Sequence, residues 1–101
     1  MNRRDTVKRM LERLEFELSL RCDSLVDTMR HNGLGRMFLS NAESFEDLLE
    51  QFSDIAEHRS FYALSCPNVV TWLNELEGIK KMQDNIRKLQ EELENGKRPQ
   101  V

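Results

Sequence analysis

The sequence predicts an all-α protein with three main helices, two long and one shorter, in a helical bundle with coiled-coil-like seams. Charged residues make up 33% of the 101 residues, and the chain has only four glycines and two prolines. This composition is typical of long, partly solvated helices, and apolar residues recur at the three-and-four spacing of one helical face. The length allows a single domain, which we place at residues 1–96, with a flexible tail at 97–101.

The first helix is expected over residues 5–31. Its inner face is a stripe with spacings of three and four residues: Val7, Leu11, Leu14, Leu18, Cys22, Leu25 and Met29. Further apolar residues lie off that stripe, which indicates contact with more than one neighbouring helix; they are Met10, Phe16, Leu20 and Val26. The run His31-Asn32-Gly33 is expected to end the helix, because Asn and Gly tolerate the left-handed cap conformation.

A connector and the shorter helix follow. Gly33 and Gly35 interrupt the helical pattern, and the apolar run 37–39 is expected to pack on the bundle, either as a loop or as a short extra helix. A strand is a further alternative, but it would lack an obvious partner strand. The second helix is expected over residues 44–63, because Ser44 and Asp47 form a capping box in which Asp replaces the usual Glu. Its predicted inner face comprises Phe45, Leu48, Leu49, Phe52, Ile55 and Ala56.

The third helix is expected over residues 67–94. Pro67 suits the first turn, where its missing N–H costs nothing, with Ser65 or Cys66 as the cap. Asn95-Gly96 is the expected stop. The back half of this helix carries a heptad seam between charged residues, as in a coiled coil: Ile79, Met82, Ile86, Leu89 and Leu93. The stripe changes phase near Gly78, so the front half is expected to face a different neighbour.

What covers this seam decides the functional interpretation. In an up-down-up path the first and third helices would run parallel and pair along their length, so the first helix is one candidate. Because the second helix is shorter, it would leave one end of that pair uncovered. We therefore favour a partner protein, either a second copy of the chain or a helical subunit of a larger complex. The predicted partner-binding residues are Ile79, Met82, Ile86, Leu89, Leu93, Leu11, Leu14 and Leu18.

A second candidate surface is a groove for a partner helix, formed by Phe61, Tyr62 and Trp72. Trp and Tyr are frequent anchors of protein interfaces. The apolar neighbourhood of Trp72 nevertheless makes a buried core position the favoured prediction for this residue.

The sequence indicates no catalytic, cofactor-binding or metal-binding residues. No Gly-rich phosphate loop and no HExxH or GxSxG motif is present. His58 has the pattern of a solvated surface residue, and His31 that of a helix end. The cysteines, Cys22 and Cys66, lack metal-ligand spacing and are expected to be reduced, buried or half-buried apolar residues.

These observations predict a non-enzymatic module for protein–protein interaction and oligomerisation, a subunit or scaffold of an intracellular complex in the cytoplasm or nucleus. The start of the chain has no signal peptide and no transmembrane run, so we expect no membrane contact. The alternative is a small regulator that touches nucleic acid through the basic residues of its first helix, Arg3, Arg4, Lys8, Arg9 and Arg13. Acidic neighbours and a net charge of −3 make nucleic acid the less favoured partner.

Overall fold

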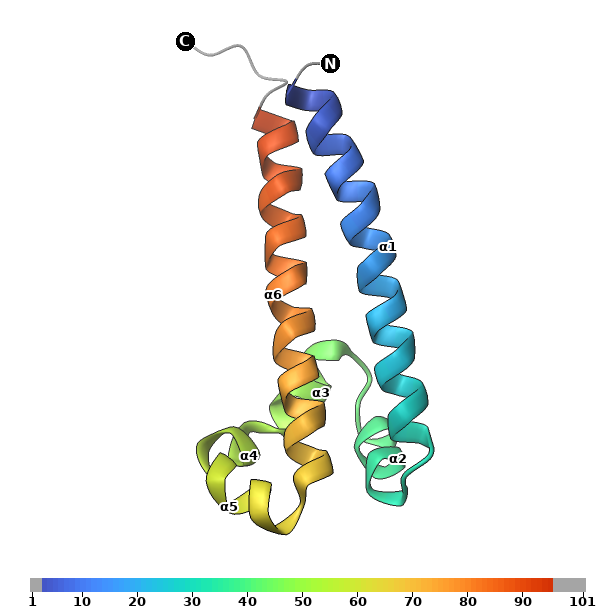
Figure 1. Ribbon diagram of the computed structural model, residues 1–101, viewed down its shortest axis with the longest axis vertical. Coiled ribbons are helices and arrows are strands. Elements are labelled where there is room, and N and C mark those ends of the chain that lie inside the picture. The colour runs from blue at the N-terminus through green and yellow to red at the C-terminus, as the bar shows by residue number, and fades with distance from the viewer. Residues whose placement is uncertain (1–2, 96–101) are drawn as a thin grey trace.

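The computed structural model describes residues 3–95, and Figure 1 shows their arrangement. The helices are α1 (Arg3–Arg30), α2 (Gly33–Ser40), α3 (Phe45–Gln51), α4 (Ser53–Glu57), α5 (Arg59–Ser65) and α6 (Pro67–Asn95). No strand occurs within the described residues, so the prediction of an all-α protein is confirmed. The predicted tail at 97–101 lies outside the described residues.

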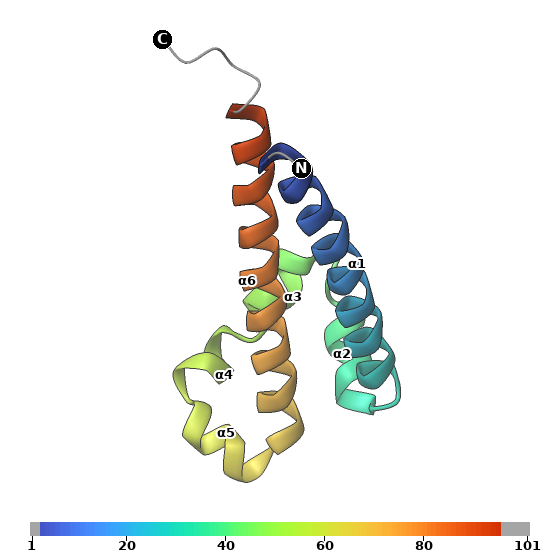
Figure 2. The same ribbon diagram turned by 45° about the horizontal axis from the view of Figure 1, so that its top comes forward.

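The two long helices, α1 and α6, lie side by side and run antiparallel (Figures 1 and 2). Arg3 at the start of α1 lies 2.8 Å from Glu92 near the end of α6, and Arg21 lies 3.5 Å from Glu75 near the start of α6. The predicted parallel arrangement is therefore wrong. The chain between the long helices stays at one end of the molecule, so it reverses direction once instead of twice.

The prediction of one continuous helix over residues 44–63 is wrong, because this segment forms three short helices, α3, α4 and α5. The backbone breaks at Phe52 and at His58, where the ψ angles are 5° and 40°. Next to each break a polar side chain bonds a backbone carbonyl: Ser53 Oγ donates to Glu50 O, and His58 Nδ1 lies 3.2 Å from Asp54 O. These local bonds compete with the helical ladder. The breaks let α4 and α5 both pack on α6.

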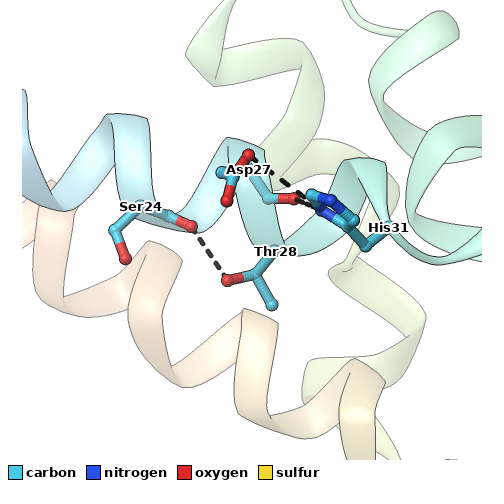
Figure 3. A network of polar contacts seen from close by, with 4 residues as sticks. All are labelled: Ser24, Asp27, Thr28 and His31. Carbon is cyan, nitrogen blue, oxygen red and sulfur yellow. Dashed lines mark hydrogen bonds and ion pairs between the residues drawn. The ribbon is translucent and has the colours of Figure 1, made fainter.

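The turn between α1 and α2 also differs from the prediction, because none of the glycines in the described residues adopts a positive φ. Asn32 is the N-cap of α2, and its side-chain oxygen accepts hydrogen bonds from the backbone of Leu34 and Gly35. A Cβ on Gly35 would lie 2.3 Å from the carbonyl oxygen of Met29. The glycine is therefore required for the close approach of α2 to the end of α1. The last turns of α1 carry local contacts of their own: Thr28 Oγ1 donates to the Ser24 carbonyl oxygen, and His31 Nδ1 lies 4.0 Å from the Asp27 carboxylate (Figure 3).

The buried residues form two separate clusters. The larger occupies the end with the short helices, and we call residues 22–79 the head; its core includes Met29, Phe52, Trp72 and Leu76. The smaller lies between α1 and α6 alone, and we call residues 3–21 and 80–95 the shaft. The molecule measures 55 × 25 × 23 Å, because the shaft extends from the head as a bare helical pair.

Candidate functional site

The predicted seam lies between α1 and α6 of the same chain. Ile79 is 1% exposed in the head core, and Ile86 is 7% exposed in the shaft beside Val7 and Leu11. The remaining seam residues are half-buried against these clusters: Leu14, Leu18, Met82, Leu89 and Leu93. The cover for the seam in this structure is thus α1, not the favoured partner protein. A role of these residues in binding another chain stays a prediction.

The head carries an open apolar groove of about 270 Å³ between α2 and the short helices α4 and α5. Its walls come from five helices and the turn that precedes α6: Leu34, Phe38, Gln51, Asp54, Ile55, Tyr62, Cys66 and Val69. Most of these residues are apolar. The groove is therefore suited to receive apolar side chains at a surface that water reaches.

Packing and one polar bond hold the α2 wall of the groove. The Phe38 ring stacks on the Phe52 ring with centroids 4.6 Å apart, and Phe52 is fully buried. Gln51 donates a hydrogen bond of 3.0 Å from Nε2 to the carbonyl oxygen of Phe38. The end of α2 is thus tied to α3, which gives this wall a defined position.

The opposite wall is organised around Tyr62. Its hydroxyl donates a hydrogen bond of 2.6 Å to the Asp54 carboxylate. This bond, followed by partial burial and the nearby negative charge, raises the pKa of the Tyr62 hydroxyl above its usual range. Arg59 lies 2.9 Å from Glu77 and ties α5 to α6. The groove therefore combines an apolar floor with a fixed carboxylate at its edge.

Of the three residues that the sequence predicts for a groove, Tyr62 lines it. Phe61 is 65% exposed and meets the Tyr62 ring edge to face at 5.3 Å, beside the groove. Trp72 is 3% exposed in the head core, so the prediction of a buried anchor is confirmed and its place in the groove is wrong. Sequence reasoning missed Leu34 and Phe38, because only the turn at Asn32 brings α2 to this surface.

Asp54 also belongs to a small polar cluster with Glu57 and His58, whose potential ligand atoms lie within 4.8 Å of one another. All three residues are exposed. One Asp54 oxygen accepts the Tyr62 bond, and the other lies 3.2 Å from His58 Nδ1. Contacts within the chain account for this cluster, and we assign it no metal.

The basic start of α1 is interleaved with acids. Arg3 pairs with Glu92, and Lys8 and Arg9 share a shallow surface hollow with Asp5 and Glu12. Of the cysteines, Cys22 is half-buried as predicted, and burial raises the pKa of its thiol. Cys66 is exposed, which corrects the prediction that both would be at least half-buried.

Comparison of the chain with protein-family models, with curated proteins and with solved structures finds no match. Within residues 3–95, no helix has the combination of length and hydrophobicity that a membrane-spanning segment requires.

Proposed function

We propose that this protein is a non-enzymatic protein–protein interaction module whose head binds an amphipathic helix of a partner protein. The observation that carries the proposal is the apolar groove between α2, α4 and α5 with its exposed apolar border. Leu34 in its wall is 38% exposed, and Phe61 beside Tyr62 is 65% exposed. Exposed apolar side chains around a concave surface are typical of binding sites for partner helices.

The open shape of the groove favours side chains of a protein over a small ligand, because a small ligand is usually enclosed by its pocket. Pockets for drug-sized molecules and cofactors measure roughly 300–1,000 Å³ and enclose most of the ligand. The groove measures about 270 Å³ and opens to solvent. That space suits one or two apolar side chains that project from a helix lying across the head.

The net charge of the segment that forms most of the groove favours a basic partner. Six carboxylates and two guanidinium groups lie between residues 33 and 66, which gives this segment a net charge of −4 with neutral histidine. Asp54 stands in the groove wall itself. Complementary potentials guide association and select partners, so the expected partner helix carries Lys or Arg beside its apolar stripe.

The test is titration of the labelled protein with a synthetic helical peptide that has Leu at i, i+3, i+4 and i+7 and Lys on both flanks. We expect binding, with amide shift changes that map to residues 34–38, 51–55 and 62–69. A matched peptide with Glu in place of Lys should bind more weakly. Absence of binding, or shift changes confined to the shaft, would contradict the proposal.

Two phenylalanines of equal exposure supply the control. Phe61→Ser should weaken peptide binding by roughly tenfold, the size of effect expected for an interface anchor. Phe16 on α1 is 66% exposed, against 65% for Phe61, and lies outside the groove. Phe16→Ser should therefore leave peptide binding unchanged, and equal effects of the two variants would place the binding elsewhere.

A further inference from the structure

A second stripe runs along the outer face of α1, on the side that does not face α6. Its residues recur at spacings of four, three, four, three and four, the pattern of a coiled-coil face: Arg9, Arg13, Phe16, Leu20, Asp23 and Asp27. All six are exposed, and Phe16 and Leu20 expose 66% and 54% of their surface. Two apolar residues thus stand at the centre of an otherwise charged helix face.

The order of chemical types along this stripe is self-complementary. It begins with two cations, continues with two apolar residues and ends with two anions. The Arg13 side chain is 83% exposed and its contact to Glu17 is 3.8 Å long. The Asp27 side chain is 74% exposed and lies 4.0 Å from His31 (Figure 3). These long, exposed contacts leave both charges accessible to a partner.

We propose that this stripe docks against the same stripe of a second copy of the chain, with the two α1 helices antiparallel about a two-fold axis beside position 18. That axis brings Phe16 opposite Leu20 of the second copy. It also brings Arg13 opposite Asp23, and Arg9 opposite Asp27. Each contact occurs twice, as a two-fold interface requires, and facing positions follow the layers of an antiparallel coiled coil.

Charge selects this direction over the parallel one. In a parallel pair each charged layer would place like charges together, Arg9 against Arg9 and Asp27 against Asp27. Like charges that face each other across an interface are unfavourable. The antiparallel pair converts all four charged layers into attractive contacts.

The resulting dimer would present two binding heads. Each α1 ends in its own head, so antiparallel pairing places the heads at opposite ends of the assembly. None of the residues that line the groove belongs to α1, so both grooves stay open. This dimer goes beyond the proposed function, because it would let one assembly hold two partner helices apart.

The test is the mass of the full chain by light scattering, over concentrations from micromolar to millimolar. We expect a dimer that dissociates on dilution and whose dissociation constant rises with salt concentration, because salt screens the charge pairs. Arg13→Asp and Asp23→Arg should each raise the dissociation constant by roughly tenfold or more, because each creates two like-charge contacts. The variant that combines both substitutions should return it close to the original value, because opposite charges then face each other again at positions 13 and 23.

Controls separate this interface from folding and from the groove. Phe16→Ser should give a folded monomer that still binds the basic peptide, while Phe61→Ser should leave the dimer intact. Arg87→Asp, at an α6 side chain that is 66% exposed, should not change the dimer. A chain that stays monomeric at millimolar concentration would overturn the proposal. A dimer that the charge swap does not rescue would overturn it as well.

Discussion

The head and the shaft use the same two long helices in different ways. In the head, α1 and α6 pack together with the short helices, and residues such as Met29 and Phe52 are fully buried. In the shaft the same helices have only each other, and the buried cluster shrinks to Val7, Leu11 and Ile86. A pair of helices can bury only a narrow stripe, whereas a broader core needs further helices packed against the pair. We infer that stability resides mainly in the head.

The largest expected effect is therefore a cavity in the head. Phe52→Ala removes a fully buried ring that stacks on Phe38. We expect a loss of about 3–5 kcal/mol in the free energy of unfolding. Chemical denaturation followed by the fluorescence of Trp72, the single tryptophan, measures this directly. If Phe52→Ala lowered the free energy of unfolding by less than the shaft variant Ile86→Ala does, the claim that stability resides mainly in the head would be wrong.

Gly35→Ala tests the junction between α1 and α2. The new Cβ would meet the Met29 backbone at 2.3 Å, so the two helices must move apart. We expect a loss of up to about 3 kcal/mol, the range of overpacked sites. Gly33→Ala is the matched control in the same helix, because nothing lies within 4 Å of its added Cβ. That variant should be neutral or slightly more stable, since Ala favours the helix. Equal losses in both would show that close approach is not the reason for Gly35.

Ile86→Ala tests the shaft. We expect a loss of about 2 kcal/mol, at the low end for such a truncation, because a two-helix pair can close around the gap. Amide exchange should accelerate in the first half of α1 and the second half of α6. The environment of Trp72 should not change. A change of Trp72 fluorescence in the folded state would show that the clusters are coupled.

The smallest expected effect is the titration of Tyr62, the single tyrosine. Its raised pKa means that the folded state holds the phenol proton more tightly than the unfolded state. The bond to Asp54 therefore contributes stability below the ordinary pKa of about 10, and this contribution is lost as pH rises through the raised value. Phenolate absorbance gives the midpoint. Asp54→Asn should lower it, and an unchanged midpoint would argue against this contact.

The sequence predicts the two long helices well. The end of α1 at Arg30 follows from the run His31-Asn32-Gly33, and the start of α6 follows from Pro67. The cap at Ser44 is also confirmed, with its hydroxyl accepting from the Asp47 N–H. The breaks at Phe52 and His58 are not visible in the apolar pattern, which continues across them. The packing of α4 and α5 on α6 accounts for these breaks, whereas local propensity alone predicts one helix.

The same reason limits prediction of the candidate site. Tyr62 is predictable because aromatic residues cluster near it in the sequence. Leu34 and Val69 join it only through the tertiary path of the chain. The direction of α1 against α6 depends on how far the middle segment travels, and apolar periodicity does not record that distance. The role of Gly78 is also not predictable from the sequence. Its missing side chain leaves room for the Arg21 guanidinium, which comes from the facing helix α1.

The most direct test of the division between head and shaft is native-state amide exchange on the Phe16→Ser variant, in which the proposed dimer face is removed. Amides of residues 25–29 and 69–79 should exchange only through global unfolding. Amides of residues 7–14 and 86–93 should exchange earlier, through opening of the shaft while the head stays folded. Equal protection in both sets would contradict the division and show a single cooperative unit.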